Sequence, residues 1–130
     1  MAEHKEDNIG EEQRVSPEIK ACVFSVGERV FSFPIENLLE IAELEEVAPL
    51  PLSPDYIDGI AHHRGEAIPV LNLETVFGIE EKASLHRWLL IVRIGGELVG
   101  LSLNNMPDLS YDFSGEVIDP YRFFESYRIR

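Results

Sequence analysis

Hydrophobic and polar residues alternate in short runs along most of the chain, which predicts β-strands joined by tight turns. Residues 22–26 and 29–35 both show this alternation, and the pair Gly27-Glu28 lies between them. A glycine at the first central position is what a two-residue type II′ hairpin turn requires. Residues 86–103 form the clearest hairpin signal, with Gly95-Gly96 at the turn.

The same Gly-Glu step recurs at Gly65, Gly96 and Gly115, each time between apolar runs. Shared turn chemistry explains this recurrence better than an internal duplication does. Four such signals indicate an all-β protein with antiparallel, meander-like strands.

Helical signals are short. Residues 53–59 combine an N-cap serine, a proline at the first helical position and a terminating glycine, which predicts one or two helical turns. Residues 73–78 end at Gly78 in the same way. Residues 36–47 are ambiguous, because their composition favours a helix while their apolar positions also fit an irregular strand.

Four aromatic residues gather near the C-terminus. They are Tyr121, Phe123, Phe124 and Tyr127. They are expected either to cap the core from a terminal helix, which is the favoured interpretation, or to present a partner surface.

The chain of 130 residues is most simply one domain. We expect residues 1–18 to be a mobile acidic tail, because they contain too few large aliphatic side chains to bury, and residues 19–130 to form the domain. A single cysteine, Cys22, excludes an internal disulfide and fits a reducing compartment. With neither a secretory signal nor an apolar run of membrane-spanning length, the chain is expected in the cytoplasm.

The net charge of −13 argues against nucleic-acid binding, which needs clustered Lys and Arg. Between Arg29 and Arg64 the chain has neither Lys nor Arg. The acidic residues of this interval are Glu36, Glu40, Glu43, Glu45, Glu46, Asp55 and Asp58. A solvated face explains them most simply, and a docking face for a basic protein patch is the functional alternative.

No motif supplies enzymatic chemistry. His62 and His63 are adjacent, so on a strand they point to opposite faces and cannot easily share one metal ion, and no recognised spacing adds His86. Cys22 lies among apolar residues, where a thiol acts as a small hydrophobic group. We therefore expect no catalytic residue, no metal and no cofactor; a metal-dependent enzyme using the three histidines is the weakest hypothesis.

Residues 35–78 resemble the CheW-like domain of bacterial chemotaxis coupling proteins. That family has a V-x-E-I element, a y-I-x-G segment, N-L-R-G, an apolar x-P-V-x-D-L strand and a helix ending in F-G, in this order. The corresponding residues here are Leu38-Leu39-Glu40-Ile41, Tyr56-Ile57-Asp58-Gly59, His62-His63-Arg64-Gly65, Ile68-Pro69-Val70-Leu71-Asn72-Leu73 and Phe77-Gly78.

The resemblance implies two small SH3-like antiparallel β-barrels packed around a shared core. It also implies a non-enzymatic adaptor that links the cytoplasmic tip of methyl-accepting chemoreceptors to the regulatory domain of a histidine kinase. When the motif positions of the family are transferred to this sequence, the candidate partner-binding residues are Arg64, Glu40, Leu38, Ile41, Gly59 and Gly65. Leu38 and Ile41 are candidates for an apolar partner groove. For Arg64, a structural role is expected at least as much as a role in binding.

The chain also departs from the family pattern. His62-His63 replace N-L, Asn72 replaces the usual aspartate and Glu74 replaces a common arginine. The C-terminal half is short, so we expect one barrel to be pared down and one of the two partner surfaces to be lost. The alternative hypothesis is a stand-alone β-barrel module that binds another signalling protein or itself.

Overall fold

The computed structural model describes residues 18–127. The expected mobile tail, residues 1–18, therefore lies outside the described residues except for Glu18. The elements in chain order are β1 (Ala21–Val26), β2 (Arg29–Pro34), η1 (Ile35–Asn37), β3 (Leu38–Leu44), β4 (Ile57–His63), β5 (Glu66–Asn72), α2 (Leu73–Phe77), β6 (Arg87–Ile94), β7 (Glu97–Leu103), β8 (Asp108–Ser110), β9 (Glu116–Val117) and α3 (Pro120–Tyr127).

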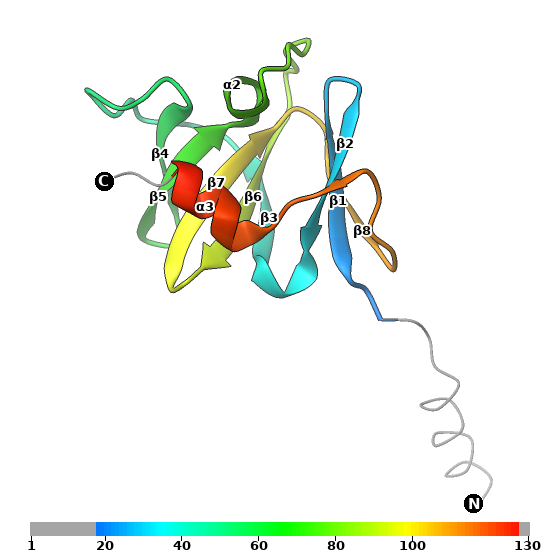
Figure 1. The fold of residues 1–130 in the computed structure, drawn as a ribbon. Helices are drawn as coiled ribbons and strands as arrows, with labels where there is room; N and C mark the ends of the chain where they lie inside the picture. Colours follow the sequence, from blue (N-terminus) through cyan, green and yellow to red (C-terminus); the bar gives the residue numbers. More distant parts are fainter. Residues whose placement is uncertain (1–17, 128–130) are drawn as a thin grey trace, which may run out of the picture.

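The strands form two sheets, which confirms the all-β prediction. One sheet has four strands in the order β8-β1-β2-β9, and the other has five in the order β3-β6-β7-β5-β4 (Figure 1). Two pairings, β2 with β9 and β5 with β7, are parallel, so the sheets are not purely antiparallel as expected. The short edge strands β8 and β9 agree with the expected reduction of the C-terminal half.

A shared hydrophobic core lies between the sheets, as the family resemblance implied. The four-stranded sheet contributes Phe24 and Phe31 to it, and the five-stranded sheet contributes residues such as Leu90 and Leu101. Phe77 of α2 stacks on Phe31 with a centroid separation of 4.2 Å. Burial of these large side chains from both sheets is the main force that holds the two halves together.

Two of the four predicted Gly-Glu turns form as expected. Val26 pairs with Arg29 across Gly27-Glu28, and Gly27 has a φ of 60°. Ile94 pairs with Glu97 across Gly95-Gly96, where both glycines have positive φ. Positive φ at these positions is what two-residue hairpins with the twist of the strands require.

The third Gly-Glu step also lies at a hairpin turn, whereas the fourth does not. The β4–β5 turn is Arg64-Gly65, because His63 pairs with Glu66, so Gly65 is the second turn residue, as Gly96 is in the β6–β7 turn. Gly115 does not make a hairpin: it leads into β9, which pairs in parallel with β2. An added Cβ at Gly115 would lie 2.1 Å from the Val30 carbonyl oxygen, so this glycine permits a close crossing of two chain segments.

The helix expected over residues 53–59 is absent, and this prediction was wrong. The chain makes one turn, in which the Ile57 N–H donates to the Pro54 carbonyl, and then enters β4. Of residues 36–47, those up to Leu44 lie in η1 and β3, because pairing with β6 outweighs their helical composition, and 45–47 have no regular secondary structure. The short helix α2 is confirmed: Asn72 accepts from the Thr75 N–H at its start, and Gly78 ends it with a φ of 68°.

The terminal aromatic cluster forms α3, as the favoured interpretation predicted. Figure 1 shows α3 in red across β6 and β7, and α3 contacts β6. Phe123 is buried, and the Tyr127 hydroxyl donates to the Val76 carbonyl at 3.3 Å. Tyr121 remains exposed. The helix therefore covers the open end of the shared core.

Candidate functional site

The five-stranded sheet curls until its two edge strands, β3 and β4, approach each other. The segment after β3 meets β4 at one bridge, where Ala48 and Ile60 exchange both backbone hydrogen bonds, at 2.9 and 2.8 Å. Gly59 makes this approach possible, because a Cβ there would lie 2.1 Å from the Ala48 carbonyl oxygen. The predicted role of Gly59 as a helix end is therefore wrong, and the glycine is needed for closure of the barrel.

A cluster of charged side chains spans the same seam farther along. Arg64 donates from Nε to Glu40 Oε1 at 3.1 Å and from a terminal nitrogen to Oε2 at 3.4 Å. His63 Nε2 lies 3.0 Å from Glu40 Oε1. Glu40, His63 and Arg64 thus connect β3 to the β4–β5 turn, and we call them the Glu40 cluster.

The electrostatics of the cluster favour an ionised Glu40. The hydrogen bond from His63, followed by that from Arg64, lowers the pKa of Glu40 from its ordinary value of 4.5. Both donors act on the charged carboxylate, which is the usual cause of such a decrease. Glu40 therefore carries a full negative charge at neutral pH.

Arg64 occupies an unusual backbone position. Its φ is 51°, and with Gly65 at 81° it forms a turn with two left-handed residues. A non-glycine residue there has a conformational cost, which the bidentate contact with Glu40 helps to offset. Its side chain is still 75% exposed. Arg64 therefore braces Glu40 and at the same time presents a cation to solvent.

The other candidate residues have mainly structural positions. Leu38 and Ile41 are half-buried and pack against the shared core, so the structure does not place them together in an open groove with Arg64. Leu39 between them is exposed. Gly65 has open space around its Cβ position, so its positive φ, and not crowding, explains the glycine.

A groove of about 390 Å³ lies along the seam between β3 and β4. Its lining residues are Glu43, Leu44, Glu45, Glu46, Ala48, Ile60, Ala61, His62, His63 and Leu89. The three glutamates come from the acidic interval of the sequence, and the apolar lining residues are Leu44, Ala48, Ile60, Ala61 and Leu89. Only this part of the acidic interval therefore lines a groove, which analysis of the sequence alone did not reveal.

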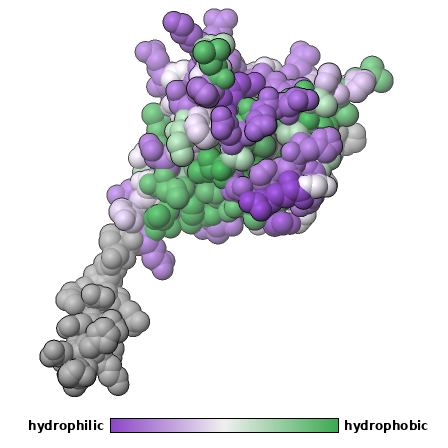
Figure 2. Space-filling model, turned by 180° about the vertical axis from the view of Figure 1, so that it is seen from behind, coloured by the Kyte–Doolittle hydropathy of each residue, from purple (hydrophilic) through white to green (hydrophobic). Residues whose placement is uncertain are grey.

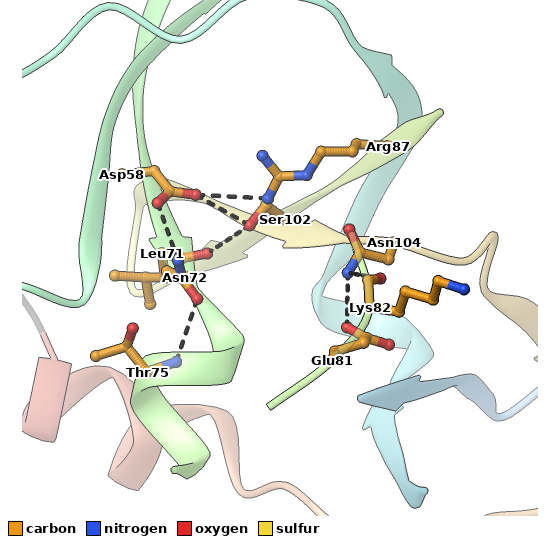
Figure 3. Close-up of polar contacts among 9 residues, drawn as sticks. All are labelled: Asp58, Leu71, Asn72, Thr75, Glu81, Lys82, Arg87, Ser102 and Asn104. Carbon is orange, nitrogen blue, oxygen red and sulfur yellow. Dashed lines mark hydrogen bonds and ion pairs between the residues drawn. The ribbon is translucent and has the colours of Figure 1, made fainter. Parts of the chain in front are cut away.

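A second polar network holds the opposite end of β4 (Figure 3). Asp58 accepts from Asn72 Nδ2 at 3.1 Å and from the Ser102 hydroxyl at 3.3 Å, and Arg87 lies 3.6 Å away. Asn72 Oδ1 accepts from the Thr75 N–H. An asparagine is suited to this position because it both donates to Asp58 and caps α2, which an aspartate cannot do.

Sequence reasoning missed this network. Asp58 was counted only as part of the acidic interval, and Asn72 only as a departure from the family pattern. No local signal pointed to it, because Asp58 and Asn72 lie on different strands and their contact depends on the β4–β5 register.

Glu81 fixes the long connection before β6. It accepts from the Gly27 N–H at 3.1 Å and from Asn104 Nδ2 at 3.0 Å, and Figure 3 shows the second contact. Gly27 belongs to the β1–β2 hairpin and Asn104 follows β7, so one carboxylate ties both halves of the molecule together.

Potential metal ligands are dispersed over the part of the chain that the structure describes. Within residues 18–127, no three His, Cys, Asp or Glu side chains gather closely enough to hold a metal ion. Burial, followed by the charge of Asp108, raises the pKa of Cys22 to about 11, so the thiol stays protonated at neutral pH. In the same part of the chain, no helix is long and apolar enough to cross a membrane.

Comparisons with known proteins identify one family. A sequence model of the CheW-like domain matches residues 20–110. The Chemotaxis protein CheW of Helicobacter pylori is 27% identical over 106 residues, covering 80% of this chain and 64% of that protein. Protein FrzA of Myxococcus xanthus is 36% identical over 83 residues, covering 64% of this chain and 52% of its own.

A solved structure agrees with the sequence comparisons. The scaffolding protein TtCheW from Thermoanaerobacter tengcongensis superposes with a TM-score of 0.64 at 28% identity, covering 76% of this chain and 66% of that one. This chain therefore spans between half and two thirds of the length of these relatives.

Replacing Glu40 with glutamine tests the electrostatic role of the Glu40 cluster. Because the pKa of Glu40 is lowered in the folded state, its contribution to stability is complete above its ordinary value of 4.5 and is lost as the pH falls below it. Wild type is thus expected to have a larger free energy of unfolding than E40Q at pH 7. This difference should shrink as the pH is lowered. Urea denaturation across the pH range measures it, with Glu43→Gln on the same strand as control; a pH-independent difference would contradict this role.

Replacing Asn72 with aspartate tests the Asp58 network. The change keeps the cap on α2 but removes the donor to Asp58. It also places a second carboxylate beside that of Asp58. We expect a loss of about 1–3 kcal/mol in the free energy of unfolding at pH 7. Asn72→Ser, which adds no charge, should lose less. If both variants unfold at the same denaturant concentration, charge repulsion is not the cause.

Proposed function

This chain belongs to the CheW-like domain family, and on that basis we propose that it is a non-enzymatic adaptor in bacterial chemosensory signalling. It connects the cytoplasmic tip of methyl-accepting chemoreceptors, the regulatory domain of a histidine kinase, or both. Its place of action is the cytoplasm, without insertion into the membrane and without nucleic acid. The single observation that carries the proposal is the family match over residues 20–110, which spans most of both sheets.

The geometry of the seam supports an adaptor more than an enzyme. In the Glu40 cluster a partly buried Glu40 holds the exposed Arg64, whose guanidinium can donate further hydrogen bonds to a partner. Arg64 and Glu40 are the residues we assign to partner contact. Leu38 and Ile41, on the same strand as Glu40, pack against the core. Gly59 and Gly65 adopt the positive φ that the backbone requires at these two positions.

The reduced C-terminal half limits the set of partners. Exposed apolar residues gather around the four-stranded sheet and the segment that follows β8, and Figure 2 shows hydrophobic surface on this side of the molecule, at the lower left. They are Ile19, Val30, Leu109, Tyr111, Phe113 and Val117. The family model matches this chain up to residue 110, and the chain covers 64% of the length of the Helicobacter pylori relative. We expect this chain to keep the partner that binds the five-stranded sheet.

Binding to purified partners tests the proposal. The full chain is expected to co-sediment with a receptor-tip fragment, a kinase regulatory domain, or both, from the same genome. Arg64→Ala should weaken that binding about fivefold or more, because a charge-assisted contact is lost, while thermal melting separates this effect from a loss of fold. Arg93→Ala, an exposed arginine outside the Glu40 cluster, serves as control.

One result would overturn the adaptor proposal, and another would overturn only the assignment of Arg64 to the partner surface. Wild-type protein that binds neither partner at tens of micromolar has no coupling role. An Arg64→Ala variant with unchanged melting and unchanged binding removes Arg64 from the partner surface.

A further inference from the structure

We propose that Leu52, at the tip of the β3–β4 connection, is the anchor by which this chain docks into an apolar pocket bordered by Lys and Arg on the kinase regulatory domain. This inference rests on the proposed function and names one partner and one residue for it. It follows from the conformation of Leu52, the bracing of its loop and the charge around it.

Leu52 is held in a position that stability alone does not explain. Its side chain is fully exposed, and its φ is 63°, in the left-handed region that leucine rarely adopts. Asparagine or glycine at this position would remove both the conformational cost and the exposed apolar surface. In the part of the chain that the structure describes, the only other non-glycine residue with positive φ is Arg64, which also borders the β3–β4 seam.

The loop that carries Leu52 is braced on both sides. Pro49, Pro51 and Pro54 restrict its backbone, and the Ser53 hydroxyl donates to the Leu50 carbonyl at 2.8 Å. Leu50 itself packs against the shared core. Figure 1 shows this connection projecting outward from the molecule next to β4. A loop restricted in this way loses little backbone entropy on binding.

The base of the loop is fixed as well. The Ala48–Ile60 bridge closes one end, and the Asn72 N–H donates to the Tyr56 carbonyl at 2.7 Å at the other. Leu52 therefore projects from the rigid closure of the barrel, which makes it a preorganised apolar knob.

The charge around the loop defines the partner. Glu45 and Glu46 lead into it from the groove, Asp55 follows its tip, and the chain has no Lys or Arg between Arg29 and Arg64. Complementarity requires basic side chains around the pocket that receives Leu52.

The shape of the surface favours a globular partner. A convex knob needs a concave pocket, which a folded regulatory domain offers more readily than the ridged surface of a helical receptor tip. We therefore assign Leu52 to the kinase domain and expect receptor binding to be independent of it.

Leu85 provides a matched control. It is also a fully exposed leucine in a loop, but its φ is not positive and it lies in the connection between α2 and β6. If exposed leucine alone promoted association, substitution of either residue would have the same effect.

The test compares Leu52→Asn and Leu85→Asn in the full chain by calorimetric titration with the kinase regulatory domain and, separately, with the receptor-tip fragment. We expect L52N to weaken kinase binding about tenfold or more and to melt no lower than wild type, because asparagine tolerates the left-handed conformation. L85N should change neither value. Added salt should lower the affinity of the wild-type chain for the kinase domain. The double variant Glu45→Gln with Glu46→Gln should show a smaller salt dependence.

Each other outcome counts against the inference. The inference about Leu52 is overturned if L52N binds the kinase domain like wild type, or if it loses only receptor binding. Either result leaves the adaptor function intact. An equal loss in L85N shows nonspecific apolar association and overturns the inference too. Wild-type protein that binds neither probe contradicts the proposed function, and the inference falls with it.

Discussion

Closure of the five-stranded sheet is the constraint on which the candidate site depends. The two edge strands meet only because Gly59 lets the Ala48 backbone approach to a distance that no side chain would permit. This contact aligns β4 against the end of β3 and so brings the Arg64 turn within reach of Glu40. The groove and the projecting Leu52 loop lie beside the same closure. Local backbone geometry at Gly59 thus helps to position Arg64 against Glu40 on the proposed partner surface.

The polar groups of the molecule divide into those that stabilise the fold and those that face outward. The Asp58 network and the contacts of Glu81 lie where elements from different parts of the chain converge, and their hydrogen bonds are used within the protein. The Glu40 cluster is different, because Arg64 is braced yet largely exposed. An adaptor needs this combination: a rigid surface that keeps its shape before a partner arrives.

The sequence predicted the parts of the fold that depend on local chemistry. The hairpin at Gly27, the end of α2 at Gly78 and the capping role of Phe123 all follow from neighbouring residues. The helix expected before Gly59 failed because its serine, proline and glycine signals also suit a turn that leads into a strand, and only pairing with β5 decides between them. Glu40 and Arg64 were identified individually through the family resemblance, but their contact depends on barrel closure, which no local pattern encodes. The Asp58–Asn72 pair escaped notice because its members lie on different strands.

Hydrogen–deuterium exchange of the full chain, with and without the kinase regulatory domain, tests the central claim most directly. If the β3–β4 seam is the partner surface, backbone amides in the β3–β4 connection and around the Arg64 turn exchange more slowly in the complex, while those of β8 and β9 keep their rates. Protection confined to the four-stranded sheet, or no protection in a complex that forms, would contradict the account.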